Sequence, residues 1–397
     1  MSRPQLILAP GKEKAVMRRH PWVFSGAVKR IEGTPEEGDL VDVVSADGHW
    51  LATGHYQQDS IICKVLTFDQ VMSEDISDLY RQRLVSAIEY RRRMGFFDSD
   101  DTNVFRLVHA EGDGLPGLVC DWYNGLLVMQ AHSVGMHRLF PLLTELFVQQ
   151  LSDYHIKAVF DKSSATVPGG CEDRYLWGEN CNEWEVMENG IHILVNPLEG
   201  QKTGFFIDQR ENRKLVQDLA NGHRVLNCFG YTGGFSLAAL KGGAEYVETV
   251  DISKKAIELC NRNVSLNENG DRHKGVVADV LKYIDTINVD PDTRFDFIIL
   301  DPPAFAKSHR HLQQGMKGYR NINQRAMEAI APGGLLMTFS CSQAVSRDDF
   351  QIMVFTAAAN AHRQVRIVRQ LPHAADHPVS IYHPEGEYLK GLLLQVE

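Results

Sequence analysis

Three aspartates and one cysteine follow short apolar runs, a place where the reactive groups of enzymes are often found. Asp251, Asp279 and Asp301 each follow such a run, and Cys341 follows a fourth within the stretch FSCS. A carboxylate can accept hydrogen bonds from ribose hydroxyls or from an amine, and a thiolate can attack an electron-poor carbon. The four residues therefore predict chemistry on a nucleotide-like ligand, with a covalent step at Cys341.

A glycine-bearing turn precedes the first of these aspartates. The stretch from Arg224 to Asp251 reads RVLNCFGYTGGFSLAALKGGAEYVETVD. A short apolar run leads into the glycines, an apolar segment at helical spacing follows, and two further glycines end it. A second apolar run then ends on Asp251, which is placed to accept hydrogen bonds from two ribose hydroxyls. This order predicts half of a nucleotide-binding βαβ unit.

The turn differs from the dinucleotide-binding fingerprint. Phe229 and Tyr231 stand near the places of its first two glycines, where bulky side chains would crowd a pyrophosphate. A ligand with ribose and adenine but no phosphate, such as S-adenosylmethionine, fits better. The alternative is an ordinary α/β turn that binds nothing.

The elements that position these residues form a predicted doubly wound sheet. Strands are expected at 224–229, 246–251, 274–279, 295–301, 335–340, 364–370 and 388–395, with helices at 253–268, 319–330 and 347–362. Ligands of such sheets bind beyond the carboxyl ends of the strands, where the strand order reverses. We therefore expect the segment 227–231 and the three aspartates to converge. Asp279 is the candidate partner of the adenine amine, although an aspartate there could equally cap a helix.

The sequence Asp301-Pro302-Pro303 ends one of these strands. Two prolines stop hydrogen bonding and stiffen the turn, which holds the acid at the edge of the cleft. Beside it, the Cys341 thiolate could add to carbon 6 of a pyrimidine and make carbon 5 nucleophilic toward a methyl sulfonium. Methylation of an amino group would need no cysteine, and a small buried hydrophobic residue is the competing interpretation of Cys341.

A polar stretch, GQKTGFFIDQRENRK, comes directly before the first strand of this sheet. Lys202, Thr203 and Gly204 could cover the amino-acid end of the cofactor, and a helix is expected to begin at Asp208 and Arg210. The alternative is a capped start of that helix.

The remaining 185 residues or so precede this catalytic part, and they suggest two more domains. A β-rich module is expected up to residue 72, with a hairpin at Asp47-Gly48 and a strand at 61–68. An α+β unit follows, with helices at about 75–94 and 135–151 and strands within 105–130 and at 156–161. The turn between two of those strands is expected at Asn124-Gly125, and no chemistry is predicted in this unit.

The composition argues against a membrane-spanning protein and against a structural zinc site. The chain of 397 residues is 44% hydrophobic and 23% charged, and it has no apolar run long enough to span a bilayer. Its seven cysteines are scattered without a CxxC pair, which argues for a reducing cytoplasm and against a structural zinc site. No metal is predicted.

The net charge of −10 argues against nucleic-acid binding only if the charge is averaged over the whole chain. Residues 1–30 contain seven basic side chains against the single acid Glu13, and such a local patch can bind phosphates. A second basic cluster comprises Arg81, Arg83, Arg91, Arg92 and Arg93. For Arg91, Arg92 and Arg93, a charged face that is exposed to solvent is favoured over a phosphate-binding site. Aromatic residues of the stretch RRHPWVFSGAVKRIEG could stack bases, although Trp22 and Phe24 are expected in a small core.

Taken together, these motifs resemble one family. KTGFFIDQR, NCFGYTGGFS, the acid Asp251, DPPAF and FSCS occur in this order in class I S-adenosylmethionine-dependent RNA methyltransferases. HPWVFSGAV resembles their PUA RNA-binding domain. The resemblance covers nearly the whole chain and is greatest to bacterial enzymes that methylate cytosine carbon 5 of 23S rRNA. It implies a PUA-like domain at 1–72, a central α+β domain at 73–185 and a Rossmann-like methyltransferase domain at 186–397.

The resemblance also implies roles for single residues. It makes Cys341 the nucleophile and places Asp301 at the target base. With the residues argued above, the predicted cofactor set is Lys202, Thr203, Gly204, Asn227, Phe229, Tyr231, Thr232, Gly233, Asp251, Asp279 and Asp301. One departure matters, because many RNA cytosine carbon-5 methyltransferases have a second cysteine directly after the proline of this motif. Here Pro303 and Ala304 follow Pro302, so Asp301 or a water would have to remove the carbon 5 proton.

Three hypotheses about function follow. The first is S-adenosylmethionine-dependent methylation of cytosine carbon 5 in 23S rRNA through a Cys341 adduct, in the cytoplasm. The second is methylation of a purine nitrogen in rRNA, and the third is a non-catalytic RNA-binding protein with a decayed cofactor site. The expected partner is 23S rRNA, with no DNA and no membrane, and an exposed strand in a small domain could support a homodimer.

Overall fold

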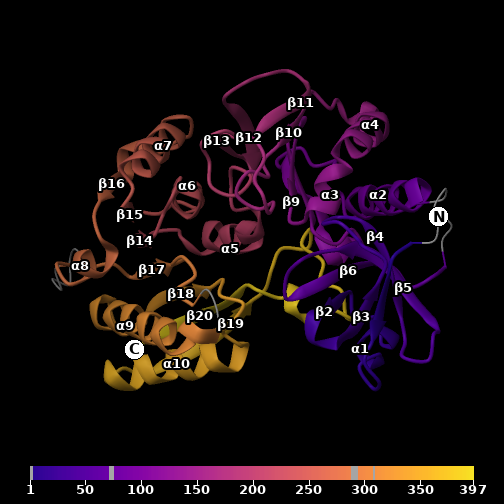
Figure 1. The fold of residues 1–397 in the computed structure, drawn as a ribbon. Coiled ribbons are helices and arrows are strands. Elements are labelled where there is room, and N and C mark those ends of the chain that lie inside the picture. Colours follow the sequence, from indigo (N-terminus) through magenta and orange to yellow (C-terminus); the bar gives the residue numbers. More distant parts are fainter. Residues whose placement is uncertain (1–2, 71–75, 288–293, 307–308) are drawn as a thin grey trace. The chain divides into compact units, whose positions relative to one another are not determined.

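The computed structural model describes residues 3–70, 76–287, 294–306 and 309–397, which Figure 1 shows as a ribbon. The chain divides into two compact units. Unit 1 comprises Met1–Val186, Val195–Ile207 and Ala375–Gly386, and unit 2 comprises Met187–Leu194, Asp208–Ala374 and Glu387–Glu397. The chain therefore passes between the units five times. The predicted domain boundary at residues 72 and 73 lies outside the described residues.

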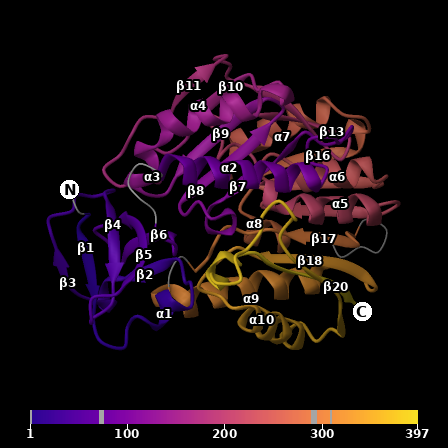
Figure 2. The ribbon, with the colours of Figure 1, turned by 90° about the vertical axis from the view of Figure 1, so that its right-hand side faces the viewer.

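Unit 1 contains a six-stranded sheet near the N-terminus. Its order is β2-β6-β5-β4-β1-β3, and Figure 2 shows these strands together in the indigo part of the ribbon. The strands are β1 (Gln5–Leu8), β2 (Trp22–Phe24), β3 (Val28–Glu32), β4 (Leu40–Val44), β5 (Trp50–Tyr56) and β6 (Ile61–Thr67), with the helix α1 at Lys14–Met17. The predicted hairpin at Asp47-Gly48 joins β4 and β5, and Gly48 has φ +90° as such a turn requires.

This sheet encloses a small core of alternate residues from its strands, among them Leu6, Val41, Val43 and Val65. Phe24 lies outside this core, because 47% of its surface is exposed. The prediction that Phe24 is a core residue is therefore wrong. Trp22 is half-buried and donates from Nε1 to Glu111 Oε1 at 2.8 Å.

A second sheet of unit 1 has the order β11-β10-β9-β8-β7. Its strands are β7 (Val104–His109), β8 (Leu118–Tyr123), β9 (Leu126–Ala131), β10 (Ala158–Asp161) and β11 (Arg174–Gly178), the last of which was not predicted. Asn124 and Gly125 both have positive φ and form the predicted tight turn between β8 and β9.

Helices α2 (Ile76–Arg93), α3 (Val134–Arg138) and α4 (Phe140–Gln150) accompany this sheet. The single helix predicted at 135–151 is two helices. Ser133 caps α3 by accepting from Met136 N at 3.3 Å, and a proline in the first turn of α4 starts a new helix.

Arg91 corrects the expectation of a solvated basic face on α2. Its side chain is fully buried and donates from Nη1 and Nη2 to the two carboxylate oxygens of Asp113, at 2.5 and 2.9 Å. Arg91 Nη2 also donates to the carbonyl of Asp376 at 2.7 Å, and Asp376 Oδ2 accepts from Arg106 N at 2.7 Å. A buried guanidinium needs such partners, so Arg91 is part of the core of unit 1 and is unavailable to phosphates.

Unit 2 is built on a seven-stranded sheet in the order β16-β15-β14-β17-β18-β20-β19. Its strands are β14 (Arg224–Cys228), β15 (Tyr246–Asp251), β16 (His273–Val277), β17 (Phe297–Leu300), β18 (Gly334–Ser340), β19 (Val365–Leu371) and β20 (Lys390–Val396). The first five in spatial order are parallel, and β20 runs antiparallel to β18 and β19. The strand order reverses between β14 and β17, as the predicted doubly wound sheet requires.

Helices cover both faces of this sheet (Figure 1). One face carries α5 (Arg210–Leu219), α6 (Gly234–Lys241) and α7 (Lys254–Ser265), and the other carries α8 (Val280–Ile284), α9 (Leu312–Ala329) and α10 (Arg347–Asn360). The core between the sheet and α9 and α10 includes Ile298, Leu336, Ile322 and Phe350. Two strands that were not predicted, β12 (Trp184–Glu188) and β13 (Ile191–Val195), form a separate two-stranded sheet.

Helix α9 begins seven residues before the predicted start and includes Gly315 and Gly318. Both glycines permit a close approach. A Cβ on Gly315 would lie 2.6 Å from Ala306 Cβ, and one on Gly318 would lie 3.1 Å from Phe305. Helix α9 therefore packs directly on the loop that follows Asp301. Within the part of the chain that is described, no helix has the length and apolarity to cross a membrane.

Candidate functional site

The glycine turn after β14 has an unusual backbone. Phe229 and Tyr231 have φ of +58° and +47°, and Gly233 has φ +87°. Gly230 N donates to Val250 O at 3.1 Å and Gly233 N donates to Gly230 O at 2.8 Å, which fix the turn between β14 and α6. Bulky residues with positive φ are uncommon and cluster at functional sites, so this strain points to a binding role for the turn.

The glycines of this turn allow a close approach to β15 and α7. A Cβ on Gly230 would lie 2.2 Å from Thr249 Cγ2, and one on Gly233 would lie 2.4 Å from Cys260 Sγ. Three polar side chains behind the turn, those of Ser236, Thr249 and His273, are joined by hydrogen bonds. Thr249 Oγ1 lies 2.6 Å from Ser236 Oγ and 2.7 Å from His273 Nε2.

We expect Gly233→Ala to destabilise the protein more than an alanine at an open glycine. Its positive φ costs about 1 kcal/mol, and displacing the buried Cys260 sulfur adds about 1–3 kcal/mol. Gly222 is the matched control, since it has φ +76° but nothing within 4 Å of its virtual Cβ. Urea unfolding of both variants measures the difference. If both variants lose the same free energy of unfolding, the contact between Gly233 and Cys260 does not contribute to stability.

Asp251 ends β15 and holds the turn through its carboxylate. Its Oδ2 accepts from Tyr231 N at 3.0 Å, and its Oδ1 accepts from Ser253 N at 2.8 Å. Each carboxylate oxygen can accept a second hydrogen bond. The oxygens are therefore oriented by the backbone and keep the capacity to accept from two ribose hydroxyls, which fits the predicted cofactor.

Asn227 and Thr232 flank the turn and are buried. Asn227 Nδ2 donates to Ser236 Oγ at 2.9 Å, and Thr232 O accepts from Asn263 Nδ2 at 3.0 Å. Asn227 Oδ1 and Thr232 Oγ1 are buried without a hydrogen-bond partner among the described residues. Such groups cost free energy unless a water or a ligand contacts them, so they are consistent with a polar ligand at the turn.

Asp279 follows β16 and caps helix α8. Its Oδ1 accepts from Lys282 N at 3.1 Å, which is the capping alternative that the sequence left open. Its carboxylate stands at the same edge of the sheet as Asp251, because β15 and β16 are parallel neighbours. A role toward adenine stays a prediction.

Asp301 and Cys341 follow two neighbouring parallel strands. Leu300 at the end of β17 is paired with Thr338 in β18, so both residues lie at the carboxyl edge of the sheet. Cys341 Sγ lies 4.0 Å from the carbonyl oxygen of Pro302, and Cys341 is only partly buried. The structure therefore brings the thiol against the Asp-Pro-Pro loop, as the sequence predicted, in a residue that is only partly buried.

Tyr319 and Ser342 hold this loop against the end of β18, and neither was predicted. Tyr319 OH lies 2.8 Å from Ser342 Oγ and accepts from Phe305 N at 3.3 Å, while Ala306 N donates to Ser342 Oγ at 3.3 Å. Burial raises the pKa of Tyr319, so its hydroxyl stays protonated. The position of Ser342 next to Cys341 was the only sequence signal for this network.

Lys202, Thr203 and Gly204 belong to unit 1, whereas the other predicted site residues belong to unit 2. Thr203 is buried and its Oγ1 donates to Asp121 Oδ2 at 2.5 Å and lies 2.9 Å from Tyr123 OH. Lys202 has φ +50° and its Nζ lies 4.4 Å from the centre of the Phe206 ring. These contacts fix the shape of the loop, and its part in cofactor binding stays a prediction.

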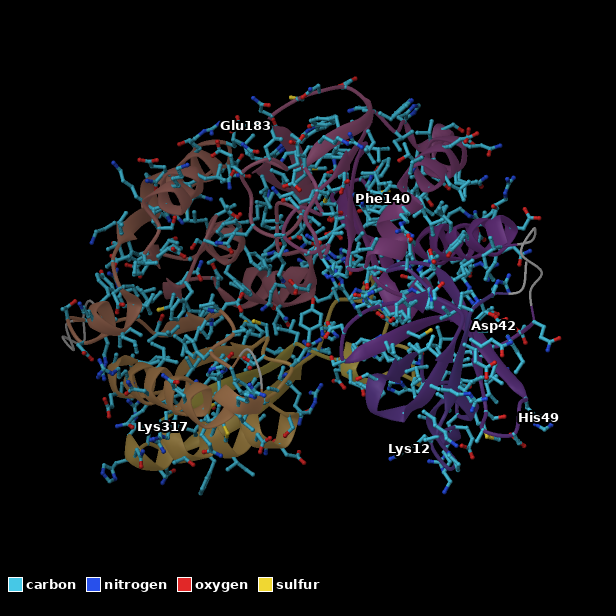
Figure 3. All side chains as sticks on the ribbon, in the orientation of Figure 1. Lys12, Asp42, His49, Phe140, Glu183 and Lys317 are labelled. Carbon is cyan, nitrogen blue, oxygen red and sulfur yellow. The ribbon has the colours of Figure 1, made fainter. Side chains whose placement is uncertain are left out.

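The basic residues of the N-terminal domain are largely exposed. Lys12, Lys14, Arg18 and Arg19 are all exposed, and Figure 3 labels Lys12 at the edge of the N-terminal strands. This segment therefore remains available to phosphates, in contrast to the buried Arg91.

One group of potential metal ligands lies in unit 1, although no metal was predicted. The ligand atoms of His137, Asp161 and Cys171 lie within 4.8 Å of one another. His137 Nε2 lies 2.7 Å from Asp161 Oδ2, so a hydrogen bond between them accounts for two of the three. No sequence pattern indicated this group, because its members come from three distant segments.

Comparison with known families agrees with this architecture. Residues 155–383 match the family described as S-adenosylmethionine-dependent methyltransferase, and residues 6–68 match the PUA-like domain. The predicted fold, with a PUA-like domain before a methyltransferase sheet, is confirmed. The predicted cofactor, S-adenosylmethionine, is confirmed with it.

Relatives match along the whole chain. Ribosomal RNA large subunit methyltransferase I of Aeromonas salmonicida is 40% identical over 402 residues, which is 98% of each chain. The Escherichia coli protein of the same name is 38% identical over 400 residues, which is 99% of each chain. Among solved structures, a SAM-dependent methyltransferase from Streptococcus mutans superposes with a TM-score of 0.85 at 21% identity, over 99% of this chain and 100% of that chain.

Proposed function

Because this chain belongs to the S-adenosylmethionine-dependent methyltransferase family, together with ribosomal RNA large subunit methyltransferase I, we propose that it methylates carbon 5 of a cytosine in 23S rRNA. The observation that carries the proposal is the thiol of the partly buried Cys341 beside the Asp-Pro-Pro loop, at the carboxyl edge of the sheet that also carries Asp251. A methyltransferase of an amino nitrogen has no need of a thiol at this place.

The cofactor supplies an electrophilic methyl group. In our proposal the Cys341 thiolate forms a bond to carbon 6 of the cytosine, and the electron pair of the 5,6 double bond moves to carbon 5. Carbon 5 takes the methyl group as the bond between that group and the sulfonium sulfur breaks, which leaves S-adenosylhomocysteine, and carbon 5 then loses its proton to a base. The 5,6 double bond forms again as the bond between carbon 6 and Sγ breaks, and the thiolate is restored.

Asp301 is the proposed residue at the target base. It follows β17 directly, and the rigid Pro302-Pro303 turn and the contacts of Phe305 and Ala306 hold its loop. Asp301 would orient the base and, alone or through a water, accept the proton of carbon 5. The target nucleotide must be unstacked, since its carbon 6 face is inaccessible within a helix.

The PUA-like domain is the proposed RNA-binding part. Its exposed basic residues, including Lys12, Arg18 and Arg19, can contact phosphates, and the exposed ring of Phe24 can stack on a base. A ribosomal RNA substrate places the reaction in the cytoplasm. We propose neither DNA nor a membrane as a partner, and a homodimer stays a prediction.

The nature of the product tests the proposal. Undermodified 23S rRNA is incubated with the protein and S-adenosylmethionine carrying a labelled methyl group, and the digested RNA is analysed by chromatography. We expect the label in 5-methylcytidine. Label in a methylated purine would support methylation of a purine nitrogen instead. Binding of S-adenosylmethionine without any transfer would favour the non-catalytic hypothesis.

A further inference from the structure

Lys390 is a buried lysine at the edge of the sheet where Cys341 lies. It begins β20, opposite Ser340 in β18, and only 4% of its surface is exposed. Its Nζ donates to the carbonyl oxygen of Ser342 at 2.7 Å. The pairing of Lys390 with Ser340 fixes the position of Lys390 along β18. The ammonium group is therefore held beside Ser342, the residue that follows Cys341.

Among the described residues, three act on the charge of Lys390: Cys341, Glu387 and Arg347. Cys341 and Glu387 favour its charged form, and Arg347 opposes it. Arg347 is itself paired with Glu387, which reduces the effect of both. From the other side, the hydroxyl of Tyr319 is bonded to Ser342 and stays neutral. A buried ammonium needs a counter-charge. Because Glu387 is already paired with Arg347, Cys341 can supply a further one by losing a proton.

We infer that the Lys390 ammonium is the counter-ion of the Cys341 thiolate, both before the thiolate adds to the base and after the base releases it. This inference rests on the proposed function, in which Cys341 is the nucleophile. Lys390 acts through Cys341 and is a positioning residue. A nearby cation lowers the pKa of a thiol and so raises the fraction of thiolate at neutral pH.

The pH dependence follows from the titration of Lys390. Burial lowers the pKa of Lys390 to about 8, so the side chain is mostly charged at pH 7 and loses its charge as the pH rises through 8. The stabilisation of the thiolate is therefore present below pH 8 and is lost above it. Because the two groups interact, the thiol and the ammonium titrate as a pair.

Alkylation of Cys341 by iodoacetamide measures this coupling without any methyl transfer. The rate is followed by peptide mass spectrometry from pH 6 to pH 10 in the wild type, in Lys390→Met and in Lys390→Arg. We expect Lys390→Met to slow alkylation at pH 7 by about tenfold, which corresponds to one pKa unit, and to approach the wild-type rate at pH 10. Lys390→Arg should restore most of the rate at pH 7, because it keeps the charge.

An internal control and a replacement variant accompany this measurement. The exposed Cys181, in unit 1, should react at the same rate in all three proteins. Lys390→Gln, with unfolding followed by circular dichroism, replaces Lys390→Met if the latter does not fold. The inference is overturned if removal of the charge leaves the pH profile of Cys341 alkylation unchanged.

Failure of this inference is distinguishable from failure of the proposed function. If Cys341 is structural, its replacement leaves methyl transfer intact whatever the alkylation rates show. If the proposed function holds but Lys390 has no role, Lys390→Met retains both the wild-type alkylation profile and the production of 5-methylcytidine.

Discussion

Replacing Cys341 by alanine should abolish formation of 5-methylcytidine, with a loss in kcat of at least about 10³-fold. Without the thiolate, carbon 5 of a cytosine is too weak a nucleophile to accept the methyl group. The fold should tolerate the change, because Cys341 is only partly buried and its sulfur makes a long contact of 4.0 Å to Pro302 O. Transfer of labelled methyl groups to undermodified 23S rRNA, followed by nucleoside analysis, measures the loss.

Cys181→Ala is the matched control, since Cys181 is an exposed thiol in unit 1. It should keep the wild-type rate. If Cys341→Ala also keeps the wild-type rate, the covalent mechanism is wrong. A methylated purine from both proteins would then make Cys341 a structural residue and favour the second hypothesis.

Asp251→Ala should weaken binding of S-adenosylhomocysteine by about 100-fold. Two hydrogen bonds from ribose hydroxyls to a carboxylate are worth about 3 kcal/mol together, which corresponds to this factor. The variant also loses the acceptors of Tyr231 N and Ser253 N, which hold the turn. Isothermal titration calorimetry measures the dissociation constant.

Asp251→Asn separates the two effects. The amide oxygen can replace one of the two backbone contacts, but the amide nitrogen cannot accept, so we expect a loss of about tenfold. Glu258→Ala, an exposed change on α7, should leave the affinity unchanged. Wild-type affinity in Asp251→Ala would remove Asp251 from the cofactor site and, with it, the present interpretation of the turn.

The parts of the fold that were predicted correctly depend on local signals. The segment from Arg224 to Asp251 forms β14, α6 and β15 as expected, because its apolar periods and its glycines act within a few residues of one another. The neighbourhood of Asp301 and Cys341 followed from a rule of topology, since parallel neighbours end at one edge of a sheet.

What escaped prediction depends on tertiary contacts. The first turns of α9 were missed, and there Gly315 and Gly318 pack against Ala306 and Phe305, a contact that the local sequence does not show. Arg91 looked like a solvated residue of a basic run, and its burial depends on Asp113 and on the distant Asp376. Tyr319 and Lys390 are 22 and 49 residues from Cys341 in the sequence, and only the sheet and α9 bring them to its strand end. A lysine at the start of the otherwise apolar run KGLLLQV was the one available sign of Lys390.

The excursion of residues 375–386 into unit 1 has a consequence for synthesis on the ribosome. The buried guanidinium of Arg91 obtains one of its acceptors from Asp376, 285 positions later, and the backbone of Arg106 depends on the same residue. A nascent chain can therefore form the strands of unit 1 early, but it cannot complete the core until nearly all of its 397 residues have been made. The N-terminal half of this protein is thus among the last parts to become fully native.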